Sequence, residues 1–195
     1  ILIDMVMNPA IVEFIRDKII EYFVAYNPRV FKAVEGEIDV IMMGDDIGAQ
    51  TGPLLSLDMW RKYFNKGFKT YIDIAHQYGI PIMYHSCGDV KQFIPDFIEC
   101  GLDILQSIQP KATNMDIKKL KQEFGKDIAF QGGMDIQHVL PLGKPEDVKA
   151  MAKYALDSAK KGGGYIICTA HNIQIDTPIE NVVALFEAYH EYGNY

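Results

Sequence analysis

The feature that most constrains the fold is a repeated alternation of short apolar, β-branched runs with longer amphipathic segments. The apolar runs lack the polar alternation of a strand with one solvated face, so they predict strands buried on both faces. Buried strands separated by helices are typical of a parallel sheet, because parallel strands need a crossover connection. Five such strands are predicted, over residues 38–43, 80–84, 103–108, 128–131 and 165–168.

Helices are predicted between these strands from capping and stop signals. Asn8 followed by Pro9 begins the first helix, which we expect to continue to about Ala25. Ser56 caps a second helix, whose apolar residues recur every three or four positions until Gly79 ends it. The remaining helices are predicted over residues 90–100, 114–124, 145–161 and 178–192.

Two architectures surround a parallel sheet with helices, namely an open doubly wound sheet and a closed (β/α)8 barrel. No Gly-x-Gly-x-x-Gly follows a predicted strand, so nothing supports a dinucleotide-binding sheet. Polar and ionisable residues follow the strands instead, and in a barrel these positions converge on one C-terminal mouth. We therefore predict an α/β fold of the (β/α)8 TIM-barrel type. We expect residues 1–195 to form one domain holding about five of the eight units, with the N-terminal part of the barrel lying before Ile1.

Charge and cysteine content exclude several classes of partner. The chain has 19 Lys and Arg against 26 Asp and Glu, a net charge of −7, which argues against binding to nucleic acid. It has no run of about 18 apolar residues and no basic segment before an apolar start, so neither a membrane span nor a signal peptide is expected. Its three cysteines, an odd number, fit a reducing cytoplasm, where cysteines serve packing, metal binding or catalysis.

The most informative stretch is Tyr-His-Ser-Cys-Gly-Asp at residues 84–89, where the second predicted strand ends. Residues two apart in a strand point to the same side, so His85 and Cys87 face one way and Ser86 faces the other. Imidazole and thiolate are preferred zinc ligands, and Gly88 lets the chain turn sharply beside a bound ion. His85 and Cys87 are therefore candidate metal ligands, but a His-x-Cys pattern alone is a weak signal, and the alternative of a packed cysteine beside a hydrogen-bonded core histidine stays open.

A second candidate stretch follows the fifth predicted strand and contains Cys168 and His171. In a barrel this strand end meets the end of the second strand. Cys168 lies within the strand, whereas His171 lies past its end, level with His85. His171 is therefore preferred as a further ligand at the mouth, with Cys168 as the alternative; burial in the packing is an equal possibility for Cys168.

Other polar residues at strand ends are candidates for catalysis or substrate binding. Asp45 and Asp46 follow the first strand, and because adjacent side chains alternate, at most one points into the site. We take Asp46, together with His171, as a candidate catalytic residue; the carboxylate could also be a metal ligand, a partner of a histidine, or only a turn residue. The predicted substrate-binding residues are Gln109, Gln131 and Asp135.

Several motifs, taken in chain order, resemble the uroporphyrinogen decarboxylase superfamily. The resemblance extends from about Ile38 to the end of the chain and is to the C-terminal part of that family's (β/α)8 barrel. The motifs are Asp45-Asp46-Ile47-Gly48 with Gln50 and Gly52-Pro53, His85-Ser86-Cys87-Gly88, Gly132-Gly133-Met134-Asp135, His171-Asn172-Ile173-Gln174, and Thr177-Pro178-Ile179-Glu180-Asn181.

The His-x-Cys-Gly element resembles one branch of that superfamily, the zinc-dependent methyltransferases that exchange methyl groups with a corrinoid protein. This resemblance implies a bound Zn²⁺ on His85 and Cys87, a corrinoid (cobalamin) protein as partner, and a small-molecule methyl donor or acceptor. In that branch a later cysteine completes the site. Counted back from Thr177, its position is occupied here by His171 and not by Cys168, which leaves the third ligand open between them.

Two alternatives to methyl transfer remain at this stage. The first is cofactor-free decarboxylation of uroporphyrinogen, which needs a cationic mouth for several carboxylates; the chain has only Arg16, Arg29 and Arg61, none at a predicted strand end. The second is a non-catalytic barrel fragment that binds a partner protein or forms a homodimer, because five units leave a sheet edge exposed.

Overall fold

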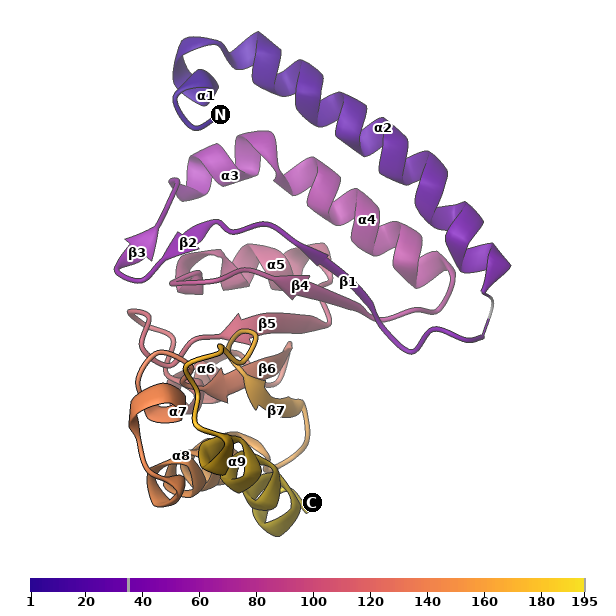
Figure 1. Ribbon diagram of the computed structural model, residues 1–195. Helices are drawn as coiled ribbons and strands as arrows, with labels where there is room; N and C mark the ends of the chain where they lie inside the picture. Colours follow the sequence, from indigo (N-terminus) through magenta and orange to yellow (C-terminus); the bar gives the residue numbers. More distant parts are fainter. Residues whose placement is uncertain (35, 195) are drawn as a thin grey trace.

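The computed structural model describes residues 1–34 and 36–194, and a five-stranded parallel sheet lies at its centre (Figure 1). Each sheet strand pairs with the next one along the chain, in the order β1-β4-β5-β6-β7. Sequential parallel pairing with helical crossovers is the arrangement of a (β/α)8 barrel, so the predicted fold class is confirmed over five units. The strands are β1 (Ile41–Gly44), β4 (Ile82–His85), β5 (Ile104–Ile108), β6 (Ala129–Met134) and β7 (Tyr165–Thr169).

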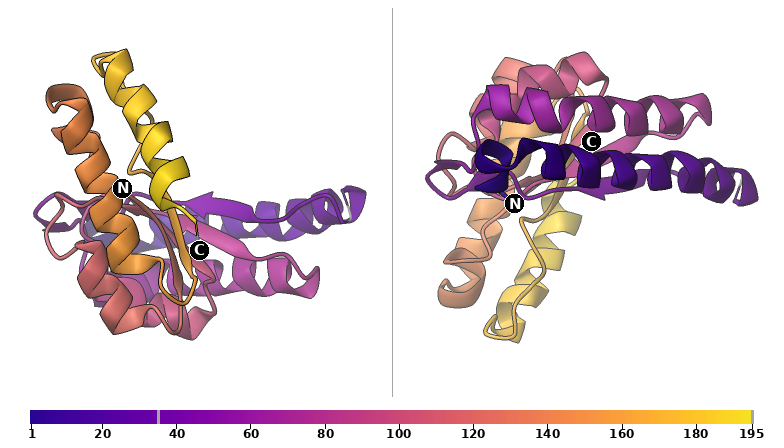
Figure 2. Two further views of the ribbon diagram at one scale, coloured as in Figure 1. Left: turned by 90° about the horizontal axis from the view of Figure 1, so that it is seen from below. Right: turned by 90° about the horizontal axis from the view of Figure 1, so that it is seen from above.

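Helices connect these strands and cover the sheet. Helices α8 and α9 pack side by side and run across the direction of α2 and α4, as Figure 2 shows. The helices are α1 (Asp4–Met7), α2 (Pro9–Ala33), α3 (Leu57–Tyr63), α4 (Asn65–Gln77), α5 (Ile94–Cys100), α6 (Ile117–Phe124), α7 (Val139–Leu142), α8 (Pro145–Ala159) and α9 (Ile179–Tyr192), with a 3₁₀ turn, η1 (Lys91–Phe93), before α5.

The two faces of the sheet differ in chemistry. Register partners point to the same face of a sheet, so each row across the strands shows what one face carries. From β4 to β7 one row is buried in the core beneath the helices and is at most 2% exposed; its members are Tyr84, Leu105, Phe130 and Tyr165. The next row, one residue further along each strand, faces the other way and is partly open to solvent; it consists of Gly44, His85, Gln106, Gln131 and Ile166.

An aromatic cluster locks β4 against its covering helices. Trp60 of α3 contacts Phe68 of α4 with ring centroids 5.5 Å apart, and Phe68 contacts Tyr84 of β4 at 4.8 Å. Tyr84 in turn meets Phe97 of α5 at 5.1 Å. Burying each of these side chains contributes about 1.5–3 kcal/mol, so the strand that carries His85 is held by a rigid, well-packed layer.

The strands begin later than the apolar runs predict. The runs at residues 38 and 80 become paired strands only at Ile41 and Ile82. Ile80 is nevertheless 8% exposed and belongs to the core. At β4 the apolar run therefore marks burial that starts before the ladder of hydrogen bonds, whereas before β1 Val40 is 39% exposed.

Two helical predictions are corrected. Helix α2 continues past Ala25 to Ala33 in spite of an internal Pro28, because Phe31 is 2% exposed and anchors the last turns in the core. The helix predicted from Ser56 to Gly79 is two helices, α3 and α4, which change direction at Phe64. The amphipathic period continues through this break, so it does not reveal the change.

A small hairpin between β1 and α3 is absent from the sequence prediction. Its strands are β2 (Gly48–Ala49) and β3 (Gly52–Pro53), which pair antiparallel. Two residues per strand are too few to show an alternating pattern, which explains the omission. Among the described residues, no helix combines the length and apolar character that crossing a bilayer would need.

Candidate metal centre

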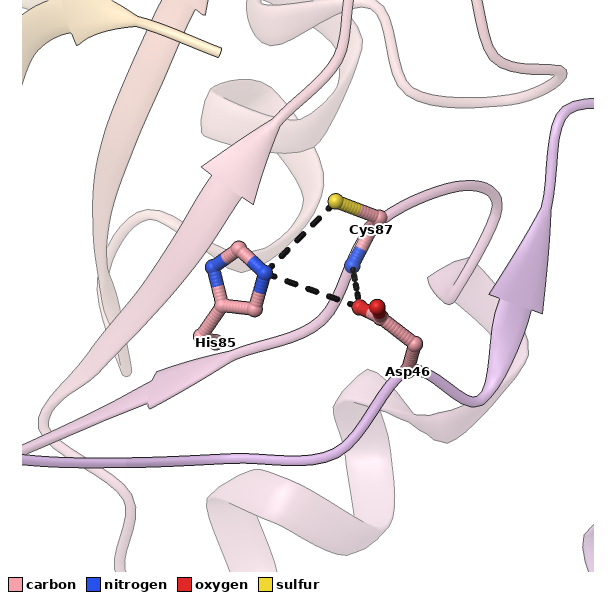
Figure 3. A group of neighbouring side chains, drawn as sticks. All are labelled: Asp46, His85 and Cys87. Atoms are coloured by element: carbon pink, nitrogen blue, oxygen red, sulfur yellow. Dashed lines mark hydrogen bonds and ion pairs between the residues drawn. The ribbon is translucent and has the colours of Figure 1, made fainter. Parts of the chain in front are cut away.

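Three side chains meet at the carboxyl ends of β1 and β4. Figure 3 shows Asp46, from the segment after β1, facing His85 and Cys87 at the end of β4. The Sγ atom of Cys87 lies 3.5 Å from His85 Nε2, and Asp46 Oδ1 lies 3.5 Å from the same nitrogen. Within the described part of the chain this is the one group of three potential ligands whose donor atoms all lie within 4.8 Å of one another.

The spacing of these donor atoms fits a tetrahedral zinc ion. Zinc binds imidazole nitrogen at about 2.0 Å and thiolate sulfur at about 2.3 Å. In a tetrahedron, a nitrogen and a sulfur at those distances lie about 3.5 Å apart, and His85 Nε2 and Cys87 Sγ have this separation. The donor set of one nitrogen, one sulfur and one carboxylate oxygen also matches the ligand chemistry of zinc.

The aspartate reaches the site through close backbone packing. The Asp46 carboxylate accepts a hydrogen bond of 2.9 Å from the Cys87 amide N–H. Behind it, the backbone at Gly48 lies against the turn at Gly88: a Cβ on Gly88 would come within 2.5 Å of the Gly48 carbonyl carbon. Gly88 also has φ +81°, which a side chain disfavours. Glycine at both positions therefore lets the segment after β1 approach the end of β4.

The neighbouring Asp45 points elsewhere, as alternation requires. Burial raises the pKa of Tyr71 in α4, and the charge of Asp45 raises it further. Burial raises the pKa of Asp45 itself, and the charge of Asp46 raises it further. Only Asp46 of this pair joins the cluster.

Burial and a nearby carboxylate keep Cys87 in its thiol form. Burial raises the pKa of the Cys87 thiol, and the charge of Asp46 and its hydrogen bond raise it further, while a hydrogen bond with Ser107 opposes this shift. The thiolate form is thus disfavoured while only the negative Asp46 is nearby. A divalent cation among the three donors would reverse this preference, because coordination deprotonates a thiol.

Hydrogen bonds behind the cluster hold its members in place. His85 Nδ1 forms a short hydrogen bond with Gln106 Oε1 on the adjacent strand β5. Gln109 Oε1 accepts bonds from the Gly88 N–H at 3.0 Å and from Gln50 Nε2 at 2.7 Å. Gln109, a predicted substrate-binding residue, therefore holds the Gly88 turn through its side-chain oxygen, and its contact with substrate stays a prediction.

Two residues of this supporting layer, Gln106 and Ser107, escape sequence reasoning. The register between β5 and β6 shifts at Ser107, which leaves an extra residue in β5. Such a bulge re-aims a side chain, and the Ser107 hydroxyl donates to the Ala170 carbonyl as well as contacting Cys87. Gln106 is a polar residue in an otherwise apolar strand, two residues before Ile108. A polar residue in this position is the sequence signal that could have identified Gln106 as part of the site.

The structure does not bring Cys168 or His171 into the cluster. Cys168 is a register partner of Gly133, so its side chain leaves the sheet on the His85 face, but β7 is three strands away from β4. Three strand spacings amount to about 14 Å. The Cys168 thiol contacts its neighbour's carbonyl, Thr169 O, at 3.2 Å, and burial raises its pKa to about 11. His171 is exposed, one residue beyond the Ala170 carbonyl that Ser107 binds.

The remaining predicted substrate residues differ in exposure. Gln131 is half-buried, next to Gln106 in the row that contains His85. Asp135 is 2% exposed and belongs to a turn, where its Oδ1 accepts from the backbone N–H groups of Gln137 and His138 at 2.8 and 3.3 Å. The structure thus gives Asp135 a role in supporting the loop after β6, and its predicted contact with substrate stays a prediction.

Comparison with known proteins relates the chain to one family. The model of the uroporphyrinogen decarboxylase (URO-D) family matches residues 1–192. The chain is 28% identical over 159 residues to the methylcobamide:CoM methyltransferase MtaA of Methanosarcina barkeri, an alignment that covers 82% of this chain and 43% of that protein. It is 25% identical over 181 residues to the uroporphyrinogen decarboxylase of Coxiella burnetii, which covers 93% of this chain and 47% of that protein.

A solved structure supports the fold. The chain superimposes on a methyltransferase from Methanosarcina mazei with a TM-score of 0.75 and 24% identity, covering 99% of this chain and 53% of that one. The chain therefore spans about half the length of the relatives that it matches.

Proposed function

The chain belongs to the uroporphyrinogen decarboxylase family, and from this premise we propose that it is a zinc-dependent methyltransferase. In this proposal it exchanges a methyl group between a small methylated substrate or a thiol and a corrinoid protein. Relatives named as methylcobamide:CoM and methylated-thiol–coenzyme M methyltransferases support this reading, although decarboxylases match at similar identity.

The observation that carries the proposal is the group of Asp46, His85 and Cys87. Cofactor-free decarboxylation has no use for a nitrogen, a sulfur and an oxygen donor gathered within 4.8 Å. A zinc-dependent transfer needs such a set, with a fourth position open to substrate. We therefore propose His85, Cys87 and Asp46 as the protein ligands of the zinc, with Asp46 as the third ligand in place of Cys168 or His171.

Each residue has a separate task in this proposal. Bound to these ligands, zinc would supply Lewis acidity that keeps a substrate thiol as a thiolate or makes a methyl ether oxygen a better leaving group. Cys87 would give up its proton to bind the metal, and His85 would present Nε2. Asp46, whose side chain is 62% exposed, can move to the metal without disturbing packed structure.

The open face of the sheet supplies candidate substrate contacts. We propose that Gln131, half-buried in the same row as His85, contacts the substrate. His171 is exposed beside the Ser107–Ala170 hydrogen bond, and we propose that it acts on the substrate as a proton donor or acceptor and is not a metal ligand. The corrinoid protein would approach this same open side.

Decarboxylation remains the second candidate because relatives of that name match most of the chain. Its substrate carries several carboxylates, and the arginines here do not serve them. Arg61 pairs with Asp96 at 2.7 Å, and Arg16 pairs with Asp17 at 2.7 Å, both on helices. Arg29 also lies on a helix, α2.

Metal content and two activity assays test the proposal. We expect about one zinc per chain by elemental analysis, and its loss in Cys87→Ala. We expect methyl transfer from methylcobalamin to a small thiol, with no conversion of uroporphyrinogen. A metal-free protein that decarboxylates uroporphyrinogen, unchanged by Cys87→Ala, would overturn the proposal in favour of the second candidate.

A further inference from the structure

Gln106 is placed to control the chemistry of His85. The two residues are register partners on adjacent strands β4 and β5, and therefore lie side by side on the open face of the sheet. The Gln106 side-chain Oε1 forms a short hydrogen bond with His85 Nδ1, and its backbone carbonyl accepts from the Ser86 N–H at 2.7 Å. One residue thus holds both the imidazole ring and the backbone that follows it.

The partners of the two ring nitrogens define what each nitrogen must do. A neutral imidazole carries one N–H, and its other nitrogen has the lone pair that a metal needs. An amide oxygen accepts hydrogen bonds only, so its contact with Nδ1 requires the proton to be there. The lone pair then lies on Nε2, which faces Cys87 Sγ and Asp46 Oδ1, each at 3.5 Å.

Without Gln106, the local charge would favour the opposite arrangement. Asp46 is a carboxylate near Nε2 and attracts an N–H to that nitrogen, which would block coordination. The His85 side chain is 26% exposed, so its ring has room to rotate if the bond at Nδ1 is lost. The glutamine therefore opposes two tendencies, the wrong proton position and the wrong ring orientation.

We propose that Gln106 is a positioning residue that fixes the Nδ1–H form of His85 and aims Nε2 at the metal position. The proton position in the metal-free protein follows from the hydrogen bond alone, whereas the consequence for zinc rests on the proposed function. Residues that orient a ligating histidine typically change metal affinity by about 10–100-fold when they are replaced.

Three variants separate this role from a general structural one. Gln106→Met keeps the length of the side chain and removes the acceptor, while Gln106→Glu keeps an acceptor. Gln131→Met is the matched control, because it changes the next glutamine in the same row, which is not a register partner of His85.

The first measurement is the ¹⁵N chemical shifts of the His85 ring in metal-free protein, assigned with His85→Gln. We expect a protonated Nδ1 and an unprotonated Nε2 in the wild type, in Gln106→Glu and in Gln131→Met, and a shift toward protonated Nε2 in Gln106→Met. A protonated Nε2 in the wild type would overturn the inference, since the amide would then donate its NH₂ to Nδ1.

The second measurement is zinc affinity by competition with a chelator. We expect Gln106→Met to bind zinc about 10–100-fold more weakly, with Gln106→Glu as tight as the wild type or tighter and Gln131→Met within about threefold. Unchanged affinity in Gln106→Met would refute the positioning role. A wild type that binds no zinc but shows the expected proton position would overturn the proposed function and leave the tautomer assignment intact. Circular dichroism melting curves check that each variant folds.

Discussion

The ends of strands β4 and β7 carry the same two residue types but have different surroundings. At β4, His85 and Cys87 lie 3.5 Å apart between Nε2 and Sγ, and Asp46 completes a group of three donors. At β7, the Cys168 thiol contacts a carbonyl of its own strand, and His171 is exposed in the following loop. A histidine and a cysteine near a strand end are therefore not sufficient to make a site.

Spacing along the strand explains the first part of this difference. Residues i and i+2 point to one side of a strand, as His85 and Cys87 do, whereas residues i and i+3 do not. Cys168 and His171 have the second spacing. The His-x-Cys pattern carries geometric information only while the chain is extended.

Supporting contacts explain the second part. The β4 end is held by Gln106, by the Gln109 bond to the Gly88 turn, and by the close packing of Gly48 on Gly88. At the β7 end, the Ser107 hydroxyl donates to the Ala170 carbonyl and the Ala170 N–H donates to the Met134 carbonyl at 2.9 Å, so both bonds hold backbone and neither holds the side chain of Cys168 or His171. The difference indicates that a set of metal ligands needs contacts that hold the ligand side chains as well as the backbone.

The largest expected contrast is in zinc affinity after removal of each thiol. Zinc in small protein sites contributes about 10–16 kcal/mol, so one of three or four ligands supplies roughly 3 kcal/mol or more. We expect Cys87→Ala to weaken zinc binding by about a hundredfold or more, measured by chelator competition. Cys168→Ala is the matched control and should stay within about threefold of the wild type. An equal loss in both variants would place Cys168 in the metal site.

A second contrast concerns the two turns. Gly88→Ala and Gly162→Ala both put a side chain at positive φ, +81° and +82°, which costs about 1–2 kcal/mol. Only at Gly88 does the new Cβ also meet backbone, whereas at Gly162 it has nothing within 4 Å. We expect Gly88→Ala to lower the free energy of unfolding by about 1–3 kcal/mol more than Gly162→Ala, measured by urea denaturation. Equal losses would show that the hairpin does not press on the β4 turn.

The smallest expected contrast is in pH dependence. Because the pKa of Cys87 is raised, its thiol keeps a proton at neutral pH in the metal-free protein and would release it on binding zinc. Zinc affinity should therefore rise with pH, by about tenfold from pH 7 to pH 8 for one proton released. Calorimetry in buffers of different ionisation enthalpy measures this proton. Cys87→Ala should release about one proton fewer, and Cys168→Ala should release as many as the wild type; a pH-independent affinity would contradict the assignment of Cys87 as a ligand.

Much of the fold could be predicted because the signals are local. Apolar runs and caps located the five sheet strands and most of the helices. The errors lie at the ends of these elements, where a residue such as Ile80 is buried but is not yet part of the strand pairing. The hairpin was missed because its strands are two residues long. The continuation of α2 was missed because burial of Phe31 overrides the break that Pro28 suggests.

By itself, the sequence determined the order of strands and helices, the family, and the shared orientation of His85 and Cys87, because all of these depend on neighbours within a few residues or on whole motifs. Only the tertiary structure decided which distant groups lie beside that pair. Asp46 lies there because Gly48 packs closely on Gly88, and Gln106 because it is the register partner of His85, whereas Cys168 lies three strands away. The physical reason is that register, bulges and backbone approach arise from packing between segments far apart in the chain, and no local pattern of residue types records them.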